Sequence, residues 1–128
     1  MNGRPRVPYD AADPRWWGIN EDGTPDERKL GEVVDAIVRA ARPEQIILFG
    51  SAATGTMNER SDLDLLVVME TATPRREAQK LMSATPPHSP PLDILVVRRE
   101  DVERTRHDSL FVTHDACRHG RMLYDARE

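Results

Sequence analysis

The clearest pattern in the chain is an apolar stripe at helical spacing between residues 24 and 44. The stripe consists of Leu30, Val33, Val34, Ile37, Val38 and Ala41. Thr24 is placed to cap this helix, Pro25 suits its first position, and Glu27 would complete a capping box with Thr24. Pro43 is expected to end the helix.

Short apolar runs after this helix predict strands at 45–49, over the run that Asp62 and Asp64 enter, at 92–97, and at the edge in 121–125. Between them we expect helices at 74–84, 99–106 and 109–119, with Gly120 placed to cap the last. Strands mixed with helices predict an α/β or α+β fold with a sheet covered on at least one face.

Residues 1–23 carry no periodicity and are rich in proline, glycine, aspartate and arginine, so we expect an irregular arm before a domain at 24–128. Trp16 and Trp17 in the arm are too apolar to stay fully in water. We favour their packing on the surface of the first helix over their docking a partner protein, although paired tryptophans are common interface anchors.

Composition narrows the function classes. The 128 residues suit a single domain, and a net charge of −4 with 31% charged residues argues against nucleic-acid binding by bulk charge. Cys117 is the only cysteine, so no intramolecular disulfide or thiolate zinc cluster can form. There is no signal-peptide pattern, and the longest apolar run is too short to span a bilayer. We expect a soluble cytoplasmic protein.

Two aspartates stand where an otherwise apolar strand begins. Asp62 and Asp64 are two residues apart, so in a strand they project from the same face. Asp93 repeats this arrangement near the start of the next apolar strand. The helix predicted between the two strands allows a crossover between parallel neighbours, which would bring all three carboxylates to one end of the sheet. The first strand must then run antiparallel for Gly50 and Ser51 to reach the same end.

Three converging carboxylates repel one another and need a cation to stay ionised in a partly buried site. Oxygen ligands alone suit Mg²⁺, which proteins hold with a few carboxylates and substrate phosphates. Gly50 lets backbone approach a ligand closely, and Ser51, as a cap of the short turn after it, offers a hydroxyl and amide groups to an anion. A P-loop is excluded because its required lysine is missing: Gly55 is followed by Thr56 and Met57. The combination indicates nucleotide chemistry.

At these residues the sequence resembles the DNA polymerase β-type nucleotidyltransferase superfamily, and in particular its minimal members, the MNT proteins. The shared pattern is Gly-Ser, a spacer of ten residues (52–61) and Asp-x-Asp, with Gly55 and Ser61 in the spacer. The strand at 92–97, the helix after it and the ending "HDACRHGRMLYD" also fit. The resemblance covers about residues 28–126.

The resemblance implies a polymerase β-like palm, with helices on a mixed sheet, that binds a nucleoside triphosphate, most often ATP, through two Mg²⁺ ions. Gly50 and Ser51 would hold the β- and γ-phosphates. Asp62 and Asp64 would hold both metals, and Asp93 would act as base or second-metal ligand for the acceptor hydroxyl. The reaction would be in-line attack of that hydroxyl on the α-phosphorus.

Many minimal members are antitoxins of a HEPN-domain ribonuclease toxin, and some transfer AMP to a tyrosine of that toxin. The resemblance therefore implies a HEPN partner in a hetero-oligomer, with no membrane association and no direct nucleic-acid binding. The alternatives are an antitoxin that neutralises by binding without catalysis, a nucleotidyltransferase toxin acting on tRNA, and an aminoglycoside-type transferase, which usually needs a further helical domain.

The chain departs from the family in the segment after Gly-Ser. Relatives often carry an arginine there, where this chain has Ala52, Ala53 and Thr54. The missing arginine favours the non-catalytic antitoxin, whereas the three aspartates favour the enzyme. If that arginine binds phosphate, Arg98, Arg99 or another basic residue would have to replace it.

Overall fold

The computed structural model describes residues 19–58, 61–86 and 89–128. The elements are, in chain order, α1 (Glu27–Ala41), β1 (Gln45–Phe49), α2 (Ser51–Thr54), β2 (Leu63–Val68), α3 (Pro74–Ala84), β3 (Leu92–Val97), α4 (Arg99–Thr105), α5 (Val112–His119) and β4 (Arg121–Asp125).

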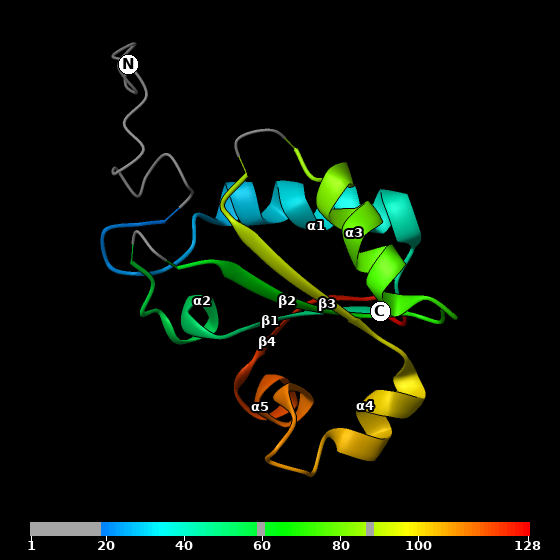
Figure 1. Ribbon diagram of the computed structural model, residues 1–128. Coiled ribbons are helices and arrows are strands. Elements are labelled where there is room, and N and C mark those ends of the chain that lie inside the picture. The colour runs from blue at the N-terminus through cyan, green and yellow to red at the C-terminus, as the bar shows by residue number, and fades with distance from the viewer. Residues whose placement is uncertain (1–18, 59–60, 87–88) are drawn as a thin grey trace.

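The four strands form one mixed sheet in the order β3-β2-β1-β4 (Figure 1). β1 is antiparallel to both β2 and β4, whereas β2 and β3 are parallel and are joined by the crossover through α3. The predicted mixed α/β fold, the parallel pairing and the edge position of the last strand are confirmed.

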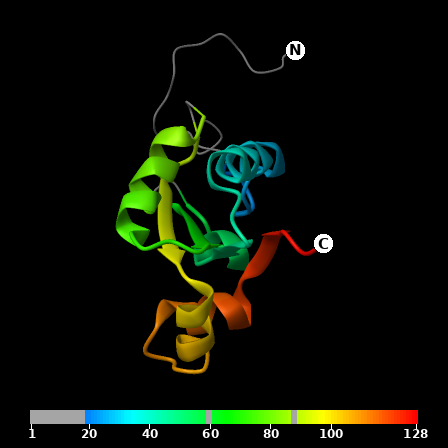
Figure 2. The ribbon, with the colours of Figure 1, turned by 90° about the vertical axis from the view of Figure 1, so that its right-hand side faces the viewer.

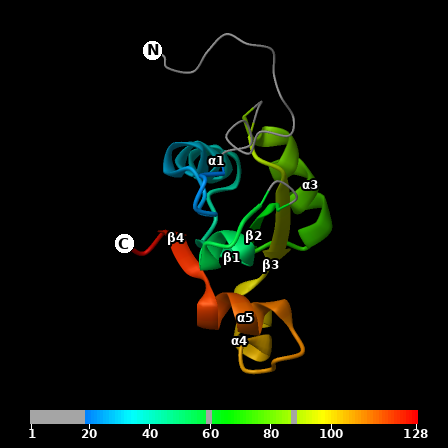
Figure 3. The same ribbon diagram turned by 90° about the vertical axis from the view of Figure 1, so that its left-hand side faces the viewer.

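Helices cover both faces of the sheet. α1 and α3 lie over one face, and α4 and α5 lie over the other (Figures 2 and 3). Leu63, Leu65 and Val67 of β2 alternate toward α1 and α3 and belong to the larger core. Leu66 points the other way and joins a small core with Ile47 and Ala116. The face that carries Leu66 also carries the aspartates of β2 and β3.

The start of α1 differs from the sequence prediction. Asp26, not Thr24, is the N-cap, and its carboxylate accepts hydrogen bonds from the backbone N–H groups of Arg28 and Lys29 at 2.9 and 3.1 Å. The Thr24 hydroxyl is instead 2.5 Å from Asp22 Oδ1, within the turn that precedes the helix. The predicted capping box is therefore wrong, and the helix begins two residues later than the box required.

The turn before α1 joins the main core. Ile19 is buried and forms an isolated bridge with Pro25. Gly23 packs against the segment after α2, where a side chain at Gly23 would overlap the carbonyl of Gly55. Trp16 and Trp17 lie outside the described residues, so their packing stays a prediction.

The C-terminal elements follow the prediction closely, with one shift. Gly120 caps α5 through its N–H, which donates to the Ala116 carbonyl at 2.9 Å, and a side chain there would meet the Leu48 carbonyl. α5 begins at Val112, whereas the sequence predicted a helix from residue 109. Within the described ranges, no helix is long and apolar enough to cross a membrane.

Candidate active site

The strand register assembles the site at the end of the sheet where α2 follows β1. Asp64 of β2 lies directly opposite Asp93 of the parallel β3, and Phe49 at the end of β1 pairs with Asp64 from the other side. Asp62 immediately precedes β2. The sheet therefore brings together the three aspartates that the sequence singled out.

The three aspartates share one electrostatic environment. Asp64 is half-buried, whereas Asp62 and Asp93 are exposed. Burial, followed by repulsion from Asp93 and then Asp62, raises the pKa of Asp64 above its ordinary value of 3.8. None of the three makes an ion pair with a described lysine or arginine. The site thus concentrates negative charge on the partly buried Asp64.

Gly50 fits against this carboxylate. It adopts φ 72° and ψ −153°, a conformation that only glycine takes readily, and a Cβ built on it would lie 2.3 Å from Oδ2 of Asp64. The chain therefore passes from β1 into α2 in direct contact with the acidic group. Because Gly50 has no side chain, the backbone can come as close to this site as a phosphate ligand requires.

Ser51 differs from its predicted role. Gly50 is the N-cap of α2, and Ser51 is the first residue of the four-residue helix, so its hydroxyl does not cap the turn. Its carbonyl accepts the N–H of Thr56 at 2.9 Å as α2 ends in the left-handed Gly55. Ser51 is half-buried beside Gly50, where its hydroxyl remains available to a ligand.

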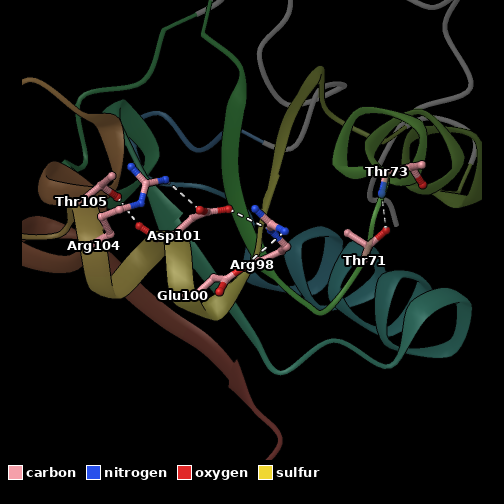
Figure 4. Close-up of polar contacts among 7 residues, drawn as sticks. All are labelled: Thr71, Thr73, Arg98, Glu100, Asp101, Arg104 and Thr105. Carbon is pink, nitrogen blue, oxygen red and sulfur yellow. Dashed lines mark hydrogen bonds and ion pairs between the residues drawn. The ribbon is translucent and has the colours of Figure 1, made fainter.

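Arg98 and Arg99 cannot replace the missing arginine, which corrects the sequence-based suggestion. They follow the carboxyl end of β3, whereas Asp93 lies at its amino end. Arg98 pairs with Asp101 at 3.1 Å and with Glu100 at 3.3 Å (Figure 4), and Arg99 pairs with Glu44 at the start of β1. Both guanidinium groups therefore lie at the end of the sheet opposite the three aspartates, which we call the far end.

Figure 4 shows the rest of this far-end network. Arg104 donates to Asp101 at 2.8 Å, and the Thr105 hydroxyl donates to the Asp101 carbonyl at 2.6 Å. Beyond β2, the Thr73 N–H donates to the hydroxyl of Thr71 and orders the turn into α3. These contacts stabilise the fold and leave the three aspartates untouched.

A cavity of about 410 Å³ also lies toward the far end, between the sheet, α4 and α5. Arg99, Arg106 and Arg127 line it, but each is already within ion-pair distance of a glutamate or aspartate. Cys117 is half-buried at its wall, and His119 is exposed.

The donor set at the site end consists of oxygen atoms. In the described part of the chain, no three histidine, cysteine, aspartate or glutamate side chains already form a metal-binding cluster. The mutual repulsion recorded in the pKa of Asp64, together with the glycine in contact with it, nevertheless fits a hard cation with a phosphate beside it. The residues present therefore suit Mg²⁺ and a nucleotide.

Known proteins resemble this chain in sequence or in fold. A protein of Methanocaldococcus jannaschii, named as a candidate protein adenylyltransferase, is 36% identical over 53 residues, which are 41% of this chain and 54% of that protein. The match thus spans about half the length of this curated relative. A nucleotidyltransferase crystal structure from Sulfolobus solfataricus superposes with a TM-score of 0.55 at 16% identity, over 79% of this chain and 81% of the other. That likeness concerns the fold.

Two crystal structures of complexes resemble the chain more weakly. A toxin–antitoxin complex with AMP-PNP gives a TM-score of 0.48 at 24% identity, over 74% of this chain and 73% of the other. A Shewanella oneidensis complex of a tri-AMPylated HEPN toxin with its MNT antitoxin gives 0.45 at 19% identity, over 79% and 73%.

The family comparison rests on the sequence. The family model described as "Nucleotidyltransferase domain" matches residues 28–114, which run from α1 into α5 and include Gly50 and all three aspartates. The match covers more than half of the chain. By its sequence, its fold and the residues gathered at one end of its sheet, this chain belongs to the nucleotidyltransferase domain family.

Proposed function

We propose that this chain is an Mg²⁺-dependent nucleotidyltransferase that moves AMP from ATP to a hydroxyl group of a protein, and that it acts as the antitoxin of a HEPN ribonuclease toxin with a tyrosine as acceptor. One observation carries the proposal. The in-register pair Asp64 and Asp93 stands next to Asp62, with Gly50 in contact with the Asp64 carboxylate.

The roles follow from position. Asp62 and Asp64 would hold two Mg²⁺ ions, which when bound stabilise charge on the entering and leaving oxygens. Gly50 and Ser51 would hold the β- and γ-phosphates with backbone amides and the serine hydroxyl. Because Asp64 alone is half-buried, it is the carboxylate whose charge depends most on a neighbouring cation.

Asp93 would face the acceptor. It lies on β3, the edge strand, whereas Gly50 follows β1 on the other side of β2. In the proposed step the acceptor oxygen bonds to the α-phosphorus, the bond from that phosphorus to the pyrophosphate oxygen breaks, and Asp93 takes the hydroxyl proton. Pyrophosphate leaves on the Gly50 side.

A protein acceptor is supported by the curated relative, which is named for protein adenylylation. The HEPN partner is supported by the resemblance to minimal nucleotidyltransferases that the Gly-Ser and Asp-x-Asp spacing carries. The net charge of −4 argues separately against a nucleic-acid acceptor, because such an acceptor brings phosphate charges that need cations.

The test is intact-mass spectrometry of the protein encoded beside this chain's gene, which the proposal expects to carry a HEPN domain, after incubation with the chain, Mg²⁺ and ATP. We expect additions of AMP mass that disappear when Asp62 and Asp64 are both changed to asparagine. ATP labelled at the γ-phosphate should leave no label on the acceptor, because pyrophosphate is the leaving group.

Two outcomes would contradict the proposal. A stable complex without AMP addition would indicate an antitoxin that neutralises by binding alone. Labelling of tRNA but not of the HEPN protein would indicate a tRNA-modifying toxin instead.

A further inference from the structure

Exposed apolar side chains gather on β3 and at the start of α5, beginning with Leu95, two residues after the candidate acceptor carboxylate Asp93. Of the six large apolar side chains that stand exposed among the described residues, four are Leu95 on β3 and Leu110, Phe111 and Val112 at the start of α5. Leu110 is 89% exposed. We refer to these four residues as the apolar patch. A soluble protein rarely leaves such a group uncovered without a partner for it.

The patch contains a pocket. Leu95, Phe111 and Val112 line a cavity of about 240 Å³ together with Val97, Thr113 and the far-end residues Asp101, Arg104 and Thr105, so the cavity extends from Leu95 toward the carboxyl end of β3. A space of this size accommodates one large apolar side chain of another protein. Apolar anchors in such pockets contribute much of the affinity of protein interfaces.

The patch is continuous with the acceptor side of the site. Leu95 follows Asp93 by two residues on the same strand face, a separation of about 7 Å along β3. The sheet order places Gly50 on the opposite side of Asp64. A protein whose hydroxyl reaches Asp93 therefore approaches over Leu95, away from the nucleotide phosphates.

The outer edge of β3 is also open. The Leu63 N–H donates to the Pro91 carbonyl and the Met69 N–H donates to the Val97 carbonyl, so odd-numbered residues of β3 bond to β2. In a parallel pair the alternate residues point away, which leaves the backbone groups of Leu92, Ile94 and Val96 facing outward. No strand pairs with this edge in the parts of the chain that the structure describes. An extended segment of a partner could bond along it.

Charge at the patch favours a polypeptide over a nucleic acid. Arg104 at the pocket wall and Arg98 after β3 both pair with Asp101. Asp93 beside the patch is negative. An RNA acceptor would bring phosphates to this surface and would need unpaired cations there.

We propose that the apolar patch and the outer edge of β3 form the docking surface for the protein that carries the acceptor hydroxyl, with one of its apolar side chains in the 240 Å³ pocket. The proposal rests on the proposed function for the identity of the partner. It adds where that partner binds and why the substrate is a folded protein surface rather than a free amino acid.

The test is the affinity of the neighbouring HEPN protein for variants of this chain, measured by isothermal titration calorimetry. Leu110→Asp and Leu95→Ser change the patch, and Leu110 is so exposed that its substitution leaves the core intact. Met82→Asp is the matched control, because Met82 is 42% exposed on α3, on the other side of the sheet. We expect each patch variant to weaken binding about tenfold or more, and the control to bind like the wild type.

A kinetic readout separates docking from chemistry. Patch variants should raise KM for the acceptor while kcat at saturating acceptor and the affinity for Mg²⁺ with a non-hydrolysable ATP analogue stay unchanged. Wild-type affinity in both patch variants, or no binding by the wild-type chain, would overturn the docking surface.

The two proposals fail separately. AMP transfer that patch variants leave unaltered would remove the docking surface and keep the enzyme. Binding that depends on the patch without any AMP transfer by the wild type would keep the docking surface and remove the enzyme.

Discussion

The two ends of the β-sheet differ in how they treat their carboxylates. At the end where β1 begins, Glu44 pairs with Arg99, and Asp125 of β4 pairs with Arg127 at 3.0 Å. At the opposite end, burial and then repulsion from two neighbouring aspartates raise the pKa of Asp64. The same sheet thus carries balanced charge at one end and concentrated negative charge at the other.

This difference separates what stabilises the fold from what prepares a ligand site. Surface ion pairs of the far-end kind contribute little but remove unfavourable interactions. At the end that carries the three aspartates, their mutual repulsion is left in place on rigid strands, which is typical of residues kept for function. A cation bound by the three aspartates would balance their charge, as the arginines balance the carboxylates at the other end of the sheet.

Changing Asp64 to asparagine should give the largest effect. We expect AMP transfer to fall more than about a hundredfold, because the half-buried carboxylate is the proposed ligand of both metals. The matched control is Asp125→Asn at the far end, which should keep wild-type activity. The rate of AMP addition to the HEPN protein measures both. Equal losses in the two variants would remove the functional distinction between the ends.

Gly50→Ala should be next in size. The new Cβ would lie 2.3 Å from Asp64 Oδ2 at a positive φ, so we expect a loss of about 1–3 kcal/mol in the free energy of unfolding and weaker nucleotide binding. Gly31→Ala is the control, because nothing lies within 4 Å of its added Cβ inside α1. It should stabilise the protein by about 0.5–1 kcal/mol. Urea unfolding gives both values, and a stable Gly50→Ala variant would contradict the close contact.

The pH dependence of stability gives a smaller effect. The folded-state pKa of Asp64 is raised, so the folded protein binds this proton more tightly than the unfolded chain does. Its contribution to stability therefore falls as pH rises above 3.8 through the folded-state pKa. Asp64→Asn should be more stable than the wild type at pH 7, by less than about 1 kcal/mol because water screens the half-buried group.

The difference between the two proteins should vanish in acid, which thermal unfolding at pH 7 and pH 3 would measure. Added Mg²⁺ should raise the melting temperature of the wild type at pH 7 and leave that of Asp64→Asn nearly unchanged. A wild type that is the more stable protein at pH 7 without metal would contradict the repulsion.

The smallest expected effect belongs to the far end. Arg99→Ala should lower the free energy of unfolding by about 0.2–1 kcal/mol, because the Arg99 side chain is 58% exposed and water screens its pair with the half-buried Glu44. A double-mutant cycle with Glu44→Gln isolates the pair, and high salt should reduce the coupling. A coupling of several kcal/mol would show that the far end does more than balance charge.

Local patterns predicted the elements well. The stripe of α1 was readable because one face of a helix repeats every 3.6 residues, and its Leu30 and Val33 are buried as expected. The position of Asp93 opposite Asp64 followed from two similar strands and a crossover helix, since parallel strands begin at the same end.

Other features needed tertiary information. Thr24 and Asp26 are both good caps, and the choice of Asp26 depends on Ile19 and Gly23, which tie the preceding turn to the core. The exposure of Leu110 could not be predicted from the sequence, because an apolar residue gives no local sign of whether it lies in the core or on the surface.

The sequence itself argues against Arg98 as the replacement for the missing arginine. Arg98 follows Asp93 by five residues along an extended strand, a distance of about 16 Å, which places it far from the proposed phosphate site. Strand direction alone therefore excluded it. The roles of Gly50, Ser51 and the aspartates remain predictions that only the activity of variants can test.

The parallel pairing of β2 with β3 has a consequence for the order of events as the chain folds. β1 and β2 are close in sequence and can pair early, but β3 is added only after α3 has crossed over the sheet. Until then a partly folded chain carries Asp62 and Asp64 without Asp93 opposite Asp64. Under the proposed function, a newly made molecule therefore gains activity only once this parallel pairing has formed.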